Sequence, residues 1–169
     1  MKLGQLEIVN KILNLNQAIK KSEELRNQDK IVVLVGGIFD ILHIGHILFL
    51  QEAKKLGDIL IILLESDKTV KKLKGSDRPF NTQKDRAEIL AVVSSTDVII
   101  PLPYIEKDEE YDRVVISLKP DIIAVTKNDP DIIHKKRQAE ILHAKIVEVV
   151  ERLPYSTSKL AQLLKNDIA

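Results

Sequence analysis

The residues best suited to chemistry lie in one short stretch, VLVGGIFDILHIGHILFL, which covers positions 33–50. An apolar run stops there at two glycines, and Asp40, His43 and His46 follow before apolar residues resume. The histidines are three residues apart, so their rings can point the same way across the first turn of a helix. The free N–H groups and positive dipole of a helix start favour a phosphate. Two imidazoles beside it can donate hydrogen bonds to phosphate oxygens during phosphoryl transfer.

Spacing alone leaves other interpretations of these residues open. Two histidines and an aspartate can also bind zinc or nickel, because imidazole suits both metals. A single histidine near a helix start is usually only a polar surface group. The same three residues therefore predict either phosphate chemistry, a metal site or a polar surface.

The elements that must position this stretch alternate between short β-branched runs and helical patterns. Strands are expected at 31–36, 58–65, 97–101, 121–125 and 145–150, and helices at about 45–56, 82–93, 108–118, 130–143 and 156–165. Most strand segments are apolar without alternation, as expected where helices cover both faces of a parallel sheet. The pattern predicts a Rossmann-like, doubly wound α/β fold in a single domain. Ligands bind such sheets at the carboxyl ends of the strands, where Gly36 and Gly37 permit close approach.

Residues 1–29 precede this pattern and are expected to form an N-terminal helical extension to a domain at 30–169. Apolar residues recur there at spacings of three and four, which indicates an amphipathic helix: Leu6, Ile8, Val9, Ile12, Leu13, Leu15 and Ile19. The helix can cap the core or pair with another subunit, and the sequence favours neither.

Composition narrows the classes of function. The 169 residues suffice for one sizeable core, and 26 basic against 25 acidic side chains leave a net charge of +1. That balance offers no global attraction for nucleic acid or anionic lipid. The lack of cysteine excludes disulfides, thiolate metal sites and cysteine nucleophiles. No apolar run suits a signal peptide or a membrane span, so a cytoplasmic protein is expected.

The segment GIFDILHIGH resembles the signature of the cytidylyltransferase-like nucleotidyltransferases: glycine, a variable residue, Phe-Asp, two residues, then His-x-Gly-His. The resemblance implies that His43 and His46 contact the nucleotide phosphates and stabilise the transition state. It also implies that Gly45 keeps side-chain bulk away from the nucleotide.

The resemblance also assigns roles to the loop before the histidines. Gly37 and Ile38 belong to the nucleotide-binding loop, and Phe39 and Asp40 shape it. For Asp40, holding the loop is favoured over direct chemistry. Ile38 stands where many members carry threonine or cysteine, so any nucleotide contact there must come from the main chain.

A second informative stretch is TVKKLKGSDRPFNTQKDRAEIL at 69–90. Lys74 and Arg86 are candidates for phosphate contact, since a guanidinium grips paired oxygens. Asn81 and Thr82 can cap the helix that carries Arg86. The pattern Leu-Lys-Gly, Arg-Pro, Asn and Arg is similar to adenylyltransferases that act on heptose 1-phosphate.

Two segments nearer the C-terminus complete the expected nucleotide site. Ser156, Thr157 and Ser158 begin an amphipathic helix, and family members carry a Ser-Thr-Thr or Ser-Ser-Thr motif there that holds phosphates. Asp129 fills the place of an aspartate that ends a glycine-rich turn near the base and ribose in relatives. It can equally cap the helix after Pro130.

The resemblance implies an enzyme that joins a nucleoside monophosphate to a phosphorylated small molecule and releases pyrophosphate. AMP from ATP is favoured over CMP from CTP, and Mg²⁺ would accompany the triphosphate without a metal site of the protein's own. Heptose 1-phosphate is the first expected acceptor. Glycerol 3-phosphate with CTP and FMN with ATP follow.

Alternatives from other classes remain. A module that senses a nucleotide without turnover and a histidine metal protein both fit part of the pattern. The His-Ile-Gly-His string also occurs in class I aminoacyl-tRNA synthetases, but the chain is too short for their tRNA-binding domains. Neither nucleic acid nor a membrane is expected as a partner, and an isologous homodimer is the default oligomer.

Overall fold

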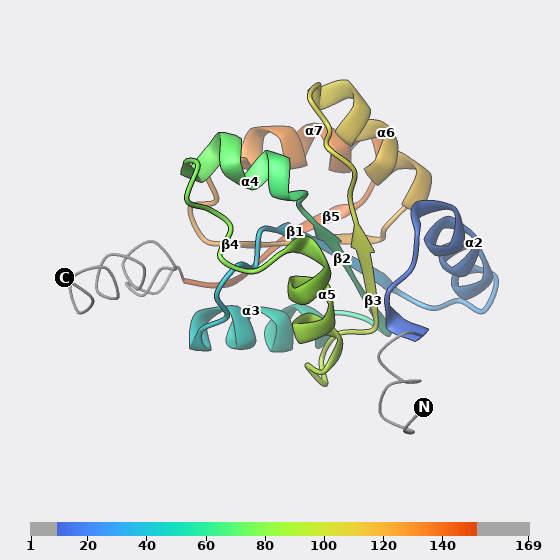
Figure 1. Ribbon diagram of the computed structural model, residues 1–169. Helices are drawn as coiled ribbons and strands as arrows, with labels where there is room; N and C mark the ends of the chain where they lie inside the picture. Colours follow the sequence, from blue (N-terminus) through green and yellow to red (C-terminus); the bar gives the residue numbers. More distant parts are fainter. Residues whose placement is uncertain (1–9, 152–169) are drawn as a thin grey trace.

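The computed structural model describes residues 10–151 and centres on a five-stranded parallel sheet in the order β3-β2-β1-β4-β5 (Figure 1). The strands are β1 (Val32–Gly37), β2 (Ile59–Leu64), β3 (Val98–Pro101), β4 (Ile122–Thr126) and β5 (Lys145–Val150). The helices named along this part of the chain are α2 (Leu15–Arg26), α3 (Ile44–Lys54), α4 (Asp67–Lys74), α5 (Gln83–Ala91), α6 (Asp108–Leu118) and α7 (Ile132–Leu142). The predicted Rossmann-like fold is confirmed, and the strand order reverses between β1 and β4, where such sheets bind ligands.

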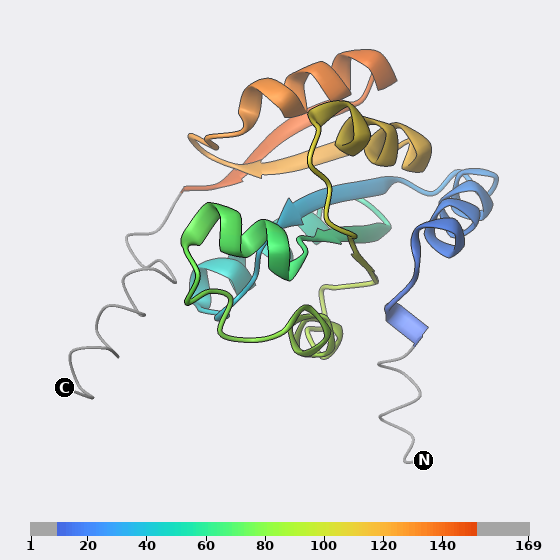
Figure 2. The same cartoon turned by 45° about the horizontal axis from the view of Figure 1, so that its top comes forward.

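Helices cover both faces of the sheet (Figures 1 and 2). On one face α3 and α5 bury Leu50 and Leu90, and on the other α2, α6 and α7 enclose a second apolar layer around Leu118. Because alternate strand residues point to opposite faces, Val33 lies in the first layer and Leu34 in the second. Burial on both sides explains why the strand segments are apolar without alternation.

The predicted N-terminal amphipathic helix is interrupted at Ile12, after helical residues 10 and 11. Its apolar residues Leu6, Ile8 and Val9 lie outside the described residues. α2 begins only at Leu15, where the Asn14 side chain accepts a hydrogen bond from the Gln17 backbone N–H at 2.9 Å. Ile12 forms a parallel bridge to Ile99 of β3 instead of a helical turn. The apolar spacing continues through this break because Ile12 packs beside the buried strand β3, and this position requires an apolar residue even though it is not helical.

α2 caps the core, one of the two roles left open by the sequence. Ala18 and Leu25 are buried in the layer that α6 shares. The Ser22 hydroxyl donates to the Leu118 carbonyl at 2.6 Å, so the last turn of α6 is held by α2. A domain boundary between residues 29 and 30 stays a prediction.

α4 is a helix that the sequence pattern did not indicate. The Ser66 hydroxyl caps it by accepting from the Thr69 backbone N–H at 3.1 Å, and Gly75 ends it with a φ of 98°. Only Val70 of this helix is buried. The remaining residues are mostly basic and exposed, so the sequence lacks the apolar stripe from which a helix is predicted. The other predicted helices that start between residues 45 and 130 agree with the structure to within a few residues. The helix expected at 156–165 lies outside the described residues.

None of the helices between residues 10 and 151 is long and apolar enough to cross a membrane.

Candidate active site

The predicted histidine pair lies at the start of α3, directly after the loop that leaves β1. His43 is the N-cap residue, and its Nδ1 accepts a hydrogen bond from the Gly45 backbone N–H at 3.2 Å. The Nδ1 of His46 accepts from the His43 backbone N–H at 3.4 Å. The two rings stack with their centroids 3.9 Å apart and 29° between their planes. Helix capping therefore fixes both rings in the first turn of α3.

Both rings are neutral and have a defined tautomer. Each Nδ1 is an acceptor, so in a neutral imidazole the proton sits on Nε2, which is then a donor. Burial, and to a smaller extent the neighbouring His43, lower the pKa of His46 to about 4. Burial also lowers the pKa of His43. Two Nε2–H donors at a helix N-terminus suit the oxygens of a phosphate chain.

Phe39 supports His46 from the loop. Its φ of 47° is left-handed, which is uncommon for a bulky residue and turns the chain sharply after β1. The Phe39 ring is buried, and its centroid lies 5.3 Å from that of His46. A Cβ at Gly37 would lie 2.7 Å from Cε2 of this ring, so only glycine leaves room for it. The space at Gly37 lets the Phe39 ring pack against His46, and this packing helps to fix the position of the His46 ring.

Asp40 ties the β1–α3 loop to the loop before α5. Its carboxylate pairs with Arg78, with Nη2 and Oδ2 2.7 Å apart, and only 2% of Asp40 is exposed. The same carboxylate accepts the backbone N–H groups of Phe80 at 2.9 Å and Asn81 at 3.1 Å. The Asn81 side chain donates back to the Asp40 carbonyl at 2.9 Å. These bonds agree with the loop-holding role that the sequence favoured.

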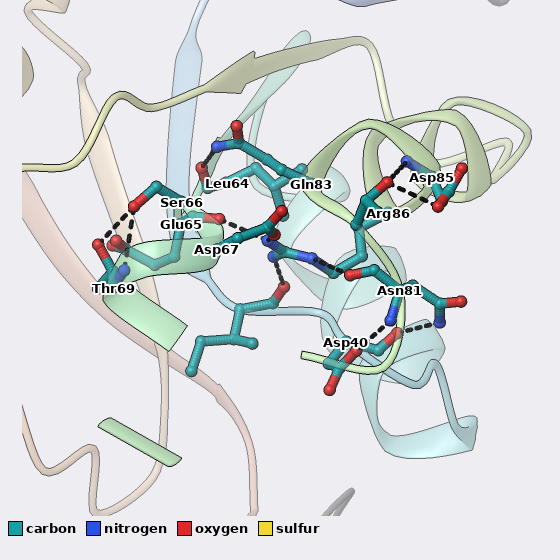
Figure 3. Close-up of polar contacts among 12 residues, drawn as sticks. Asp40, Leu64, Glu65, Ser66, Asp67, Thr69, Asn81, Gln83, Asp85 and Arg86 are labelled. Atoms are coloured by element: carbon teal, nitrogen blue, oxygen red, sulfur yellow. Dashed lines mark hydrogen bonds and ion pairs between the residues drawn. The ribbon is translucent and has the colours of Figure 1, made fainter. Parts of the chain in front are cut away.

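Arg86 joins three segments at the carboxyl edge of the sheet (Figure 3). Its guanidinium donates to the Ile38 carbonyl, to the Glu65 carbonyl at 2.8 Å and to the Asp67 carboxylate at 2.8 Å. Nε donates to the Asn81 carbonyl at 3.2 Å, and the side chain has no exposed surface. The geometry therefore favours positioning of the loops over the phosphate grip expected from the sequence. Thr82 caps α5 as expected, accepting from the Asp85 N–H at 3.2 Å.

Asp129 lies in the loop between β4 and α7. Its side chain accepts from the Asp131 backbone N–H at 2.8 Å in the turn before α7 and pairs with Lys135 of α7 at 2.8 Å. The N-cap residue of α7 is Asp131, so Asp129 does not cap the helix as the second prediction expected. Asn128 before it has a φ of 57°, a conformation that glycine adopts freely and asparagine tolerates. This explains how the chain makes the turn without the glycines expected there.

The remaining predicted residues are spread around the loop. Gly45 is in the first turn of α3, and Lys74 is exposed in the last turn of α4. Ser156, Thr157 and Ser158 lie outside the described residues.

Sequence reasoning missed several residues that build the site. Gln83 donates to the carbonyls of Leu64 at 3.0 Å and Leu102 at 2.8 Å, which holds the ends of β2 and β3 together. Asp67 pairs with Arg86, as described above. A signal was available: the polar run Glu-Ser-Asp directly follows the apolar second strand. Polar residues at that position meet the carboxyl edge of the sheet.

The part of the chain that the structure describes contains no group of three or more His, Asp or Glu side chains that could hold a metal ion. In addition, both histidine Nδ1 atoms accept backbone N–H groups, and the Asp40 carboxylate is occupied by Arg78. The interpretation as a histidine metal protein therefore gains no support from these residues.

The comparison with protein families decides the identification. The family described as cytidylyltransferase-like matches residues 34–163, which include the histidine segment and all five strands apart from the first two residues of β1. The chain belongs to the cytidylyltransferase-like family. The predicted family is thus confirmed, and with it the prediction that the chain is a nucleotidyltransferase.

Individual relatives agree with this assignment. The chain is 38% identical to the bifunctional protein HldE of Campylobacter jejuni subsp. doylei over 163 residues, 91% of this chain and 33% of that protein. It is 38% identical to the bifunctional protein HldE of Helicobacter pylori over 157 residues, 92% of this chain and 31% of the relative. The chain therefore spans about a third of the length of these curated relatives.

Solved structures agree as well. A lipopolysaccharide core biosynthesis protein from Thermoplasma volcanium superposes with a TM-score of 0.58 at 28% identity, over 75% of this chain and 99% of that one. Pantoate-beta-alanine ligase from Francisella tularensis has a TM-score of 0.58 at 18% identity, over 91% of this chain and 76% of that one. The second likeness shows the fold alone.

Proposed function

We propose that the chain is an adenylyltransferase that joins AMP from ATP to a sugar 1-phosphate, heptose 1-phosphate in first place, and releases pyrophosphate. The observation that carries the proposal is the pair of neutral, stacked imidazoles at the start of α3. Backbone N–H groups occupy both Nδ1 atoms, so the donor of each ring is Nε2. Such donors stabilise negative charge that grows on a phosphate during transfer.

The proposed reaction is a direct displacement. A phosphate oxygen of the acceptor attacks the α-phosphorus of ATP in line, and the bond from that phosphorus to the bridging oxygen of the β-phosphate breaks. Pyrophosphate leaves with the electron pair. His43 and His46 donate hydrogen bonds to the α- and β-phosphate oxygens as charge develops, and no covalent intermediate with the protein forms.

The other residues of the proposed site bind or position. Gly37, Gly45 and the main chain of Ile38 border the phosphates, and Lys74 adds positive charge at the end of α4. Ser156, Thr157 and Ser158 hold the phosphates from the C-terminal segment, and Asp129 lies on the side of the base and ribose. Asp40 and Arg86 hold the loops.

Mg²⁺ is part of the proposal as an ion that arrives with ATP. In phosphoryl transfer such an ion neutralises the triphosphate and the leaving pyrophosphate, and it is commonly held by phosphates with few protein ligands.

The choice of acceptor is supported by two observations. The stretch at 69–90 is similar to adenylyltransferases of heptose 1-phosphate, and the relatives named HldE cover about nine tenths of the chain. Glycerol 3-phosphate with CTP and FMN with ATP are the next acceptors to test. An isologous homodimer stays a proposal that sedimentation of the purified protein tests.

A matrix of nucleotide against acceptor tests the proposal. ATP and CTP are each combined with heptose 1-phosphate, glycerol 3-phosphate and FMN in the presence of Mg²⁺, and pyrophosphate is measured. We expect release with ATP and heptose 1-phosphate. Nucleotide binding without pyrophosphate from any pair would instead favour a nucleotide-sensing module.

A further inference from the structure

Glu65 follows β2 directly and lies at the same edge of the sheet as the histidine loop (Figure 3). Its backbone is held on both sides: its N–H donates to the Gly37 carbonyl at 3.1 Å, and its carbonyl accepts from Arg86 at 2.8 Å. Leu64 belongs to the apolar layer of α3 and α5, and Leu63 to the opposite layer. Because strand residues alternate, Glu65 falls on the face of α6, across the sheet from α3.

Tyr111 brings a hydroxyl to Glu65 from α6. The Tyr111 hydroxyl and the Thr69 side chain both hydrogen-bond to the Glu65 carboxyl. The hydroxyl also lies against β1, because a Cβ at Gly36 would be only 2.8 Å from it. The glycine at position 36 therefore leaves room for the tyrosine hydroxyl, which occupies the space where the sequence predicted close approach of a ligand.

Further carboxylates act on this pair, of which Asp129 is paired with Lys135. Burial raises the pKa of Glu65, and the carboxylate of Asp131 raises it further, whereas Arg86 acts in the opposite direction. Asp131 and Asp129 also raise the pKa of Tyr111, after burial and Glu65. A phosphate is repelled from such surroundings, but a neutral hydroxyl group is not.

The carboxyl of Glu65 has capacity for a ligand. Two carboxylate oxygens offer about four acceptor positions, and Thr69 and Tyr111 use two of them. Glu65 is half-buried, so the remaining positions are not sealed from the carboxyl edge of the sheet. In the proposed reaction the acceptor phosphate meets the α-phosphate of ATP near the start of α3, so hydrogen-bond acceptors beside α6 would suit the hydroxyl-bearing end of the acceptor.

We propose that Glu65 determines acceptor specificity by accepting hydrogen bonds from the sugar hydroxyl groups, with Tyr111 and Thr69 positioning its carboxyl. The inference rests on the proposed transfer to a sugar 1-phosphate. It deepens that proposal, because it assigns the hydroxyl-bearing part of the acceptor to the α6 side of the sheet. FMN and glycerol 3-phosphate would present other groups to Glu65.

The test combines kinetics with binding. Glu65→Gln keeps the size and the acceptor oxygen but removes the charge, Tyr111→Phe removes one support, and Glu110→Gln is a matched control on the exposed side of α6. We expect Glu65→Gln and Tyr111→Phe to raise the KM for heptose 1-phosphate by about 10- to 100-fold, the usual effect of losing a hydrogen bond to a charged group. The KM for ATP and all constants of Glu110→Gln should stay within about twofold of wild type.

Calorimetry with a non-hydrolysable ATP analogue separates the hydroxyl contacts from the phosphate contacts. Wild type and Glu65→Gln should bind methyl phosphate, which carries no hydroxyl groups, with equal affinity, and should differ for heptose 1-phosphate. Equal affinity of the two proteins for heptose 1-phosphate, including no binding by either, overturns the role of Glu65. If wild type releases no pyrophosphate, the proposed function fails, and this binding comparison still decides the role of Glu65. If Glu65→Gln does not fold, Tyr111→Phe decides by the same comparison.

Discussion

Asp40 and Arg78 form a buried ion pair, with Oδ2 and Nη2 2.7 Å apart, between the loop that leads to the histidines and the loop that leads to α5. Replacing Asp40 by Asn leaves the Arg78 charge buried and unpaired. We expect Asp40→Asn to lower the free energy of unfolding by about 3 kcal/mol, measured by urea denaturation. The exposed pair Lys55–Glu52 is the control, and Glu52→Gln should change stability by less than about 0.5 kcal/mol. Equal effects of the two substitutions would show that the buried pair does not hold the loop.

Arg86→Lys separates a positioning role from a phosphate contact. Lysine cannot make the four contacts of the buried guanidinium, so we expect a lower melting temperature without nucleotide as well as a lower kcat. Lys74→Ala is the comparison, because this exposed lysine should leave the melting temperature unchanged and weaken ATP binding. A wild-type melting temperature together with a raised KM for ATP in Arg86→Lys would instead support a direct contact between Arg86 and the phosphates.

Gly37→Ala tests the support of His46 by Phe39. The new Cβ would lie 2.7 Å from the Phe39 ring, so the ring and the stacked histidine must move. We expect kcat to fall by at least about 10-fold, since small displacements of catalytic groups are costly. Gly75→Ala is the control: it strains a φ of 98° but meets no atom within 4 Å, so it should cost about 1 kcal/mol of stability and little activity. Unchanged kcat in Gly37→Ala would contradict the proposed packing.

The lowered pKa of His46 makes stability depend on pH in a defined window. In the unfolded chain this imidazole takes up a proton below about pH 6.5, whereas in the folded chain it stays neutral until about pH 4. The unfolded state therefore binds more protons between these values, and stability falls as the pH drops from 6.5 to 4. Between pH 7 and 4.5 we expect wild type to lose about 2 kcal/mol more than His46→Asn, measured by urea denaturation. Equal losses in the two proteins would show that the pKa is not lowered.

The sequence predicted the parts of the fold that depend on local pattern. The apolar strand runs and the loop GIFDILHIGH were sufficient for the sheet, the start of α3 and the histidine pair. α4 was missed because it buries one residue, Val70, so its sequence lacks an apolar stripe. The break before Leu15 was missed because the bridge of Ile12 to β3 also demands an apolar residue.

The sequence identified many residues of the candidate site, but it did not show which of them contact ligands and which hold the loops. Arg86 has the chemistry of a phosphate ligand, and only its position beside three loop carbonyls shows what it holds. Glu65 and Tyr111 lie 46 positions apart in the chain, and α6 alone brings them together. Contacts of this kind depend on tertiary packing, which no local pattern records.

The most direct test of the central claim compares His46→Asn with His46→Gln. The asparagine amide oxygen can still accept from the His43 N–H, as Nδ1 does, but no donor reaches the place of Nε2. The glutamine amide nitrogen does reach that place. With ATP, Mg²⁺ and heptose 1-phosphate, we expect His46→Asn to lose about 10²–10³-fold in single-turnover rate and His46→Gln to lose less. Wild-type rates of pyrophosphate release by His46→Asn would contradict the account.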